Sequence, residues 1–219
     1  MEESSRMAEV LEPVEQLALV VHTSPVLEMG DEQFFKFCQI NRDLRIERTA
    51  EGDLIIMPPA GGSSSLGNAQ LTYLFSEWAR RDGTGQIFDS SAGFKLPNGA
   101  TRSPDVSWVL NSRLERLTDE EFEKFPPLCP DFVLELRSPG DPLRVVKGKM
   151  EEYIGNGARL GWLPDPVHKQ VHIYRPGQPP ETLDHPPQIS GEPVLRGLVL
   201  DVPQIWAAME RKAGERSKS

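Results

Sequence analysis

Two acidic residues in apolar surroundings are the first candidates for chemistry. Glu135 lies inside the run FVLEL, where a carboxylate is costly unless it is paired or binds a metal. Asp105 opens the strand-like run DVSWVL. Strand alternation could instead turn Glu135 to an exposed edge or toward an arginine, and Pro-Asp commonly opens a strand. Together with the carbonyl of Leu136, the two carboxylates offer the hard oxygen ligands that Mg²⁺ or Mn²⁺ prefers.

Basic residues gather directly after Glu135, in an otherwise acidic chain. The run contains Arg137, Arg144, Lys147 and Lys149, with Asp141 as its one acidic residue. On a helix, Val146, Met150 and Tyr153 form an apolar stripe that Lys149 borders. A lysine that snorkels from a packed helix would give the same pattern. The alternative is a cation directed toward the carboxylates.

Other common catalytic patterns are missing from the sequence. There is no GxxxxGK[ST] phosphate loop, no GxSxG nucleophile motif and no Cys–His zinc pattern. The two cysteines, Cys38 and Cys129, have apolar or proline neighbours, which is typical of buried thiols and not of a disulfide framework. The sequence therefore disfavours a P-loop nucleotide site, a serine hydrolase of that type and a zinc site.

Composition restricts the class of protein. The 219 residues have a formal net charge of −9, so contacts with nucleic acid must be local and helped by a cation. With 20 Pro and 18 Gly, the chain favours turns and short strands. The apolar run at 17–21 is too short to span a membrane, and acidic residues precede it. We expect a soluble cytoplasmic protein without a membrane partner.

The candidate residues must be positioned by a mixed set of helices and strands. We expect an acidic, poorly ordered leader (1–24), one domain (25–209) and a polar tail (210–219). The predicted helices are 31–42, 66–81, 118–125 and 143–154. A hairpin is predicted around Glu51-Gly52, a flexible loop at GGSSS (61–65), and further strands at QIFD, AGFKL, DVSWVL, 131–137, RLGWLPD, KQVHIYRP and PVLRGLVLDV. This order indicates an α/β or α+β fold with a central mixed sheet flanked by helices.

The spacing of the acidic residues resembles the PD-(D/E)xK nuclease superfamily, which has the restriction-endonuclease-like fold. Asp105 follows a proline, and Glu135-Leu136-Arg137 matches the later part of the motif. Longer segments in the same order are similar to the Uma-two family of predicted restriction endonucleases. These segments are IIMPPAGG, GFKLPNGATRSPDVSWV, CPDFVLELRSPGDPL, KMEEYIGNGARLGWLPDP, IYRPGQ and RGLVLDVPQIW, within roughly residues 27–206.

The resemblance implies a role for each of several residues. Asp105 and Glu135 match metal-binding carboxylates, and Lys149 and Tyr153 match a Lys-xxx-Tyr helix. The chain departs from the superfamily at Arg137, where lysine is usual. Arginine cannot act as a general base, although it can hold a phosphate.

A second departure lies on the first long helix. Many nucleases of this fold have a glutamate there as an additional metal ligand, whereas this chain has Gln70, and Glu77 is two turns away.

The predicted function is a metal-dependent DNA endonuclease that hydrolyses phosphodiester bonds with Mg²⁺ (or Mn²⁺). Asp105, Glu135 and the Leu136 carbonyl would hold the metal, Lys149 would orient the water or phosphate, and Arg137 would stabilise developing charge. Arg102 and Arg144 are candidate phosphate-binding residues, although Arg102 could equally be a solvated turn residue.

Two other functions stay open. One is a nuclease-fold module, weak or inactive in catalysis, that binds nucleic acid or a protein. The other is a hydrolase of small phosphoesters. Because nucleases of this type often cut as dimers, the resemblance also suggests a homodimer.

Overall fold

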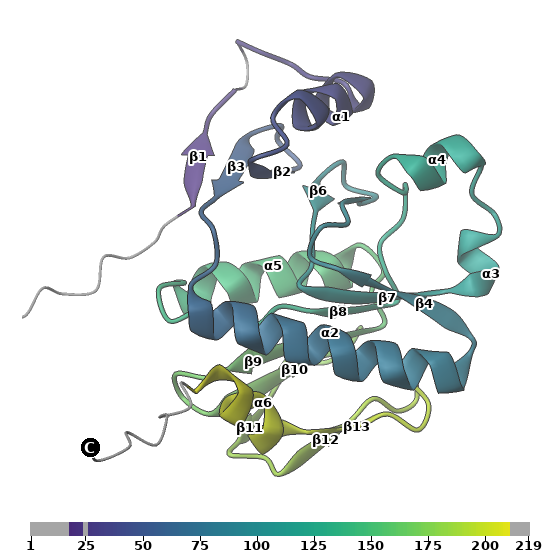
Figure 1. Ribbon diagram of the computed structural model, residues 1–219. Coiled ribbons are helices and arrows are strands. Elements are labelled where there is room, and N and C mark those ends of the chain that lie inside the picture. Colours follow the sequence, from purple (N-terminus) through teal and green to yellow (C-terminus); the bar gives the residue numbers. More distant parts are fainter. Residues whose placement is uncertain (1–17, 24–25, 211–219) are drawn as a thin grey trace, which may run out of the picture.

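The computed structural model of the protein, shown in Figure 1, describes residues 18–23 and 26–210. Most of the predicted leader and nearly all of the predicted tail therefore lie outside the described residues. Within the described part of the chain, no helix combines the length and the apolar character needed to span a membrane.

A six-stranded mixed sheet forms the centre of the molecule. In spatial order its strands are β11 (Glu181–Asp184), β10 (Gln170–Tyr174), β9 (Leu160–Asp165), β8 (Phe132–Leu134), β7 (Val106–Leu110) and β4 (Gly85–Asp89). Strands β8 and β9 are parallel, and every other neighbouring pair is antiparallel. The predicted central mixed sheet is confirmed.

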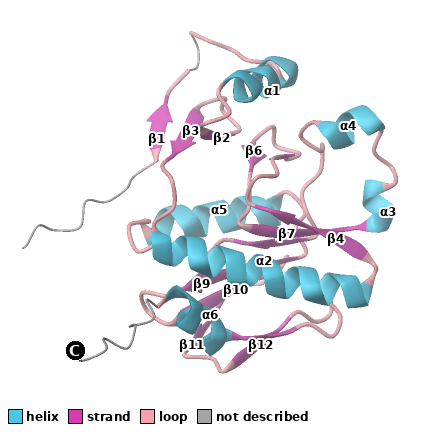
Figure 2. Cartoon of the chain, in the orientation of Figure 1, coloured by secondary structure: helices cyan, strands magenta, loops and turns pink. Residues whose placement is uncertain are grey.

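Helices cover both faces of this sheet (Figure 2). Helices α2 (Gly62–Asp82) and α6 (Val202–Met209) pack on one face, and α5 (Leu143–Gly155) packs on the other. The short strand β8 shows why: Phe132 and Leu134 belong to the core under α2 and α6, whereas Val133 belongs to the core under α5. This alternation continues past the strand, because Leu136 joins the α2 core and Glu135 contacts α5.

A second sheet carries the N-terminal part of the domain. Its strands, in spatial order, are β1 (Leu19–Val21), β3 (Leu54–Met57), β2 (Arg45–Arg48), β6 (Thr101–Arg102) and β5 (Phe94–Lys95). Strands β2 and β3 form the predicted hairpin around Glu51-Gly52, with Arg48 opposite Leu54. Helix α1 (Asp31–Ile40) buries Phe34 in the small core of this layer. Strand β1 lies within the stretch that the sequence assigned to the leader.

The remaining elements are short. They are α3 (Asn111–Leu114), α4 (Asp119–Glu123), β12 (Gln188–Ser190) and β13 (Val199–Asp201). Thr118 caps α4 as the sequence predicts, because its side chain accepts a hydrogen bond from the Glu121 backbone N–H. Helix α6 was not predicted: Asp201 accepts from the backbone N–H of Gln204 and starts a helix directly after the strand predicted at PVLRGLVLDV.

Two predicted elements are wrong at the places that bear on the site. The stretch 61–65 is not a loop, because α2 begins at Gly62 and the backbone N–H of Ser65 already donates to the Gly61 carbonyl. The strand predicted over 131–137 ends at Leu134. Beyond it, the backbone N–H groups of Glu135 and Arg137 still donate to carbonyls of β9, but on the β7 side a side chain replaces the backbone partner.

Candidate functional site

Asp105 and Glu135 lie side by side at the end of two neighbouring strands. Val106 of β7 pairs with Leu134 of β8, so the two carboxylates lie just beyond the last backbone pair. The Leu136 backbone N–H donates to Asp105 Oδ2 at 2.9 Å. This side-chain bond takes the place of a backbone partner and ends the ladder. Asp105 and Glu135 are 8% and 7% exposed, so both are buried.

Helix α5 directs two side chains at Glu135. The Lys149 Nζ lies 2.8 Å from Glu135 Oε1, and the Tyr153 hydroxyl donates to the same oxygen at 2.9 Å. The two residues are four apart and therefore share one helix face. The expected approach of Lys149 to the carboxylates is found. Gly161 of β9 permits this packing, because a Cβ there would lie 2.6 Å from Met150 Cε on the same helix.

Glu47 of β2 is a third buried carboxylate, and the sequence analysis missed it. Its Oε1 lies 2.8 Å from Lys149 Nζ and accepts from the Ser103 backbone N–H at 2.9 Å. Lys149 is thus shared between Glu47 and Glu135, which come from different sheets. One sequence signal could have indicated Glu47: it lies in the first strand of a predicted hairpin, and the second strand of that hairpin is apolar. We call Glu47, Asp105, Glu135, Lys149 and Tyr153 the Glu135 site.

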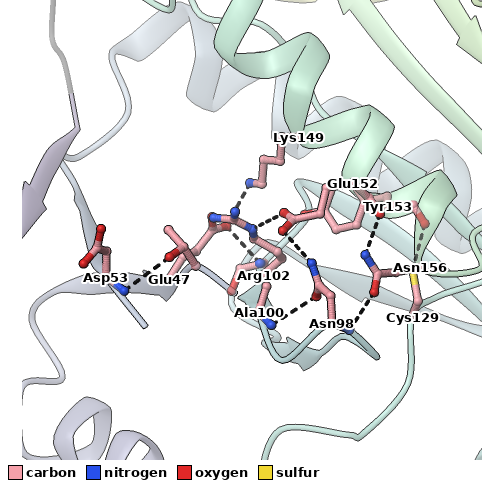
Figure 3. A network of polar contacts seen from close by, with 12 residues as sticks. Glu47, Asp53, Asn98, Ala100, Arg102, Cys129, Lys149, Glu152, Tyr153 and Asn156 are labelled. Carbon is pink, nitrogen blue, oxygen red and sulfur yellow. Dashed lines mark hydrogen bonds and ion pairs between the residues drawn. The ribbon is translucent and has the colours of Figure 1, made fainter. Parts of the chain in front are cut away.

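Arg102 is held in an ion-pair chain behind this site. Its Nε donates to Glu152 Oε2 at 2.6 Å and its NH1 to Glu47 Oε2 at 3.2 Å, as Figure 3 shows. Asn98 donates to the other oxygen of Glu152 at 3.0 Å. Because Arg102 is 9% exposed and has two carboxylate partners, its placement argues against the phosphate contact predicted from the sequence.

Arg137 shares the α5 face with Glu135 but belongs to a different group of residues. Its NH1 donates to both oxygens of Asp165, at 3.0 and 2.9 Å, and its Nε donates to the Asp141 carbonyl at 3.0 Å. His168 Nδ1 lies 2.8 Å from Asp165 Oδ2. We call Arg137, Asp165 and His168 the Asp165 cluster. Arg137 follows Glu135 by two positions and so faces the same side of the sheet, but a neighbouring strand supplies its partner.

The Glu135 site has an unusual charge balance. Burial, together with the charges of Asp105 and Glu47, raises the pKa of Glu135 to about 7, although Lys149 acts in the opposite direction. Burial also raises the pKa of Asp105. For Glu47 the effect of burial is outweighed by Lys149 and Arg102, so its pKa is lowered. A buried carboxylate that titrates near neutrality is typical of functional sites.

Helix α2 brings an amide to Asp105. Asn68 Nδ2 donates to Asp105 Oδ1 at 3.3 Å. The helix lies close because residue 67 is glycine: a Cβ there would be 2.7 Å from Leu136 Cδ2. The helix position that reaches the carboxylates is therefore Asn68 and not Gln70, which the sequence analysis considered. Among the described residues, Asn68 Oδ1 is buried without a hydrogen-bond partner.

The residues around Asp105 carry the oxygen ligand types that a hard cation prefers. Within residues 18–23 and 26–210, no group of three or more His, Cys, Asp or Glu side chains is arranged to hold a metal ion. A cation at this place would thus depend on Asp105, Glu135, the Leu136 carbonyl and the unpartnered amide oxygen of Asn68. Such a mixed set of oxygen ligands suits Mg²⁺, which usually keeps several waters.

Arg144 lies on the first turn of α5 and is exposed. It stays a candidate for a phosphate contact, since its side chain is open to solvent.

The mixed sheet between helices, with buried carboxylates and a lysine at one end, defines a restriction-endonuclease-like protein. The chain belongs to the Uma2 family, whose description is "Putative restriction endonuclease" and whose model matches residues 31–203. The fold resembles the crystal structure of a "putative nuclease belonging to DUF820" from Anabaena variabilis ATCC 29413. That match has a TM-score of 0.68 and 20% identity, and covers 84% of this chain and 100% of the other. No curated protein matches the chain.

Proposed function

We propose that the protein is a Mg²⁺-dependent endonuclease that hydrolyses phosphodiester bonds in DNA at the Glu135 site. The observation that carries the proposal is the approach of Lys149 Nζ to within 2.8 Å of Glu135 Oε1, beside Asp105 and at the end of the central sheet. Membership of a family described as restriction endonucleases supports the same reaction class.

The residues at Asp105 fit the proposed cation. Asp105, Glu135, the Leu136 carbonyl and the Asn68 amide oxygen would hold it, and the buried, unpartnered Asn68 oxygen supports this choice. A bound Mg²⁺ supplies a Lewis acid that polarises the phosphate and lowers the pKa of water.

Lys149 provides the positive charge for the transition state. Its ammonium is fixed by Glu135 and Glu47, both at 2.8 Å. Burial lowers the pKa of Lys149, but the two carboxylates outweigh burial and hold this pKa above its ordinary value. Lys149 therefore stays protonated at neutral pH. It acts as a fixed charge that orients the phosphate and offsets the negative charge that grows there, and Glu47 acts as its positioning residue.

Arg137 has a different place in this proposal from the one predicted. Its guanidinium is bound to a buried aspartate, so it stabilises the end of β9 and does not contact the phosphate.

The contact between Arg137 and Asp165 favours a second candidate function. Arg137 stands where the superfamily usually has lysine. If Arg137 serves only the Asp165 cluster, the protein could be a nuclease-fold module that binds nucleic acid without cutting it.

The test is cleavage of supercoiled plasmid DNA, followed on agarose gels with Mg²⁺, with Mn²⁺ and with EDTA. We expect nicked or linear products that require a divalent cation and that are lost in Asp105→Asn and Glu135→Gln. DNA binding without cleavage in the folded wild-type protein would support the second candidate. Cleavage that persists in both variants would overturn the proposed site.

A further inference from the structure

Arg45 is a cation beside the Glu135 site whose hydrogen-bond donors are not all used. It begins strand β2, two residues before Glu47, and its NH2 donates to the Ser103 carbonyl at 2.8 Å. Its contact with Asp105 Oδ1 is long, at 3.6 Å. In the described part of the chain, its Nε is buried and has no hydrogen-bond partner.

The other cations near the carboxylates are more fully engaged. Lys149 contacts two carboxylates at 2.8 Å, and Arg102 contacts two at 2.6 and 3.2 Å. Their side chains are 16% and 11% exposed, whereas the Arg45 side chain is 35% exposed. An anion that approaches from solvent therefore meets Arg45 before it meets the buried cations.

The position of Arg45 also places it within electrostatic reach of the whole site. Burial opposes its charged form, but Asp105, Glu135 and Glu47 outweigh this effect and hold its pKa above the ordinary value. The guanidinium consequently keeps its charge at any pH of interest.

We infer that Arg45 binds a phosphate group of the nucleic-acid backbone and presents it to the Asp105–Glu135 pair. This inference rests on the proposed function and names the residue that holds the substrate. A guanidinium donates hydrogen bonds to phosphate oxygens, and the Arg45 side chain is 35% exposed, so its solvent-facing edge can donate to such a group although its Nε is buried. In a chain of net charge −9, a local cation of this kind is needed because the overall charge repels the substrate.

Asp105 connects this contact to the cation site. The carboxylate of Asp105 now attracts Arg45 at 3.6 Å. If Asp105 shared its charge with a divalent cation, that attraction would weaken and the guanidinium would be freer to contact a phosphate. Binding of DNA should accordingly depend more strongly on Arg45 with Ca²⁺ present than with EDTA.

The experiment measures binding of a short fluorescein-labelled DNA duplex by fluorescence anisotropy in Ca²⁺, over a series of salt concentrations. For Arg45→Gln we expect about tenfold weaker binding, and a slope of log K against log salt that is smaller in magnitude by about one. Arg45→Lys, which keeps the charge but not the guanidinium geometry, should lose less. The matched control is Arg42→Gln, since Arg42 is exposed and its guanidinium contacts only Gln39 among the described residues.

Each outcome decides the inference. Unchanged affinity and slope in Arg45→Gln, or an equal loss in Arg42→Gln, would overturn it, as would a wild-type protein that does not bind the duplex. Thermal unfolding of each variant identifies any misfolded protein. If Arg45→Gln is misfolded, the duplex affinity of Arg45→Lys compared with that of the wild type decides.

Plasmid cleavage in Mg²⁺ is measured on the same preparations. Binding that depends on Arg45 without cleavage would contradict the proposed hydrolysis and would still support the phosphate contact of Arg45. Cleavage with unaltered binding by Arg45→Gln would do the reverse.

Discussion

The Glu135 site and the Asp165 cluster lie on the same face of the central sheet. Glu135 of the first and Arg137 of the second are two positions apart in the sequence. In the Asp165 cluster, burial of Asp165 is outweighed by hydrogen bonds from His168 and Arg137, which lower its pKa. In the Glu135 site, burial wins and raises the pKa of Glu135 to about 7. Both carboxylates are buried, so burial alone does not explain the difference.

The donors and the neighbouring charges of each carboxylate explain it. Asp165 receives Arg137, the imidazole of His168 and the backbone N–H of Val167. Glu135 shares Lys149 with Glu47 and also accepts from the Tyr153 hydroxyl, while Asp105 and Glu47 add negative charge beside it. A satisfied ion pair stabilises the fold, whereas a buried carboxylate whose pKa is raised to about 7 can exchange its proton for a cation. Of the two places, the comparison selects the Glu135 site as the one suited to chemistry.

Removing Arg137 should have the largest effect on stability. Arg137→Ala leaves the fully buried carboxylate of Asp165 without its guanidinium, and we expect the free energy of unfolding to fall by about 3–5 kcal/mol. Urea denaturation measures this loss. Arg137→Lys, which keeps the charge, should retain part of the stability.

The same variants test whether Arg137 takes part in catalysis. At a temperature well below the unfolding midpoint, kcat for plasmid cleavage by Arg137→Ala should stay near the wild-type value. A folded Arg137→Ala protein with a greatly reduced kcat would remove the distinction between the two groups of residues.

Removing Lys149 should have the largest effect on the reaction. Lys149→Ala should slow Mg²⁺-dependent cleavage about a hundred- to a thousandfold, because the fixed charge beside the phosphate is lost. Lys147→Ala, on the same helix, is the matched control and should cleave normally. Wild-type cleavage by folded Lys149→Ala would contradict the assigned role.

Lys149 also has a structural contribution that the sequence did not reveal. From the sequence alone, we expect Lys149→Ala to leave the thermal midpoint nearly unchanged. The structure corrects this expectation, because Lys149 neutralises two buried carboxylates. The variant should lose stability, and Glu135→Gln in the same chain should restore part of it without restoring cleavage. Calorimetry of the single and double variants separates the two contributions.

The glycines next to the site should give smaller effects. Gly67→Ala places a Cβ 2.7 Å from Leu136 Cδ2 and 2.9 Å from Met209 Cγ. We expect a loss of about 1–3 kcal/mol and weaker Mn²⁺ binding, because α2 and its Asn68 must shift. Gly148→Ala is the control: no described atom lies within 4 Å of a Cβ there, so the variant should gain up to about 1 kcal/mol. Equal Mn²⁺ affinity in Gly67→Ala and the wild type would argue against a role for Asn68.

Local sequence patterns predicted the parts of the site that depend on a single element. Helical spacing placed Lys149 at the border of the stripe that contains Tyr153, whereas alternation along the strand left the face of Glu135 open. The predictions failed where the partner comes from elsewhere in the chain. Glu47 reaches Lys149 across 102 positions, and no local pattern indicates that contact.

The early end of β8 has a similar cause. The run 131–137 has the composition of a longer strand, but the Asp105 side chain takes the Leu136 backbone N–H that a strand partner would use. Helix α6 was missed because its apolar residues follow a strand directly, and the Asp201 cap and Pro203 in the first turn were the signals of the change. Propensity describes one segment at a time, whereas these features depend on contacts between segments.

The central claim is that Asp105 and Glu135 hold a divalent cation, and titration of the protein with Mn²⁺ in a calorimeter, repeated across pH, tests it most directly. Because Glu135 has a pKa of about 7 and must lose its proton to bind the ion, the affinity should be constant above pH 7 and fall by about tenfold for each pH unit below it. Binding should release a proton in the lower range, and Glu135→Gln should lose both the affinity and this pH dependence. Mn²⁺ binding that is independent of pH and unchanged in Glu135→Gln would contradict the account.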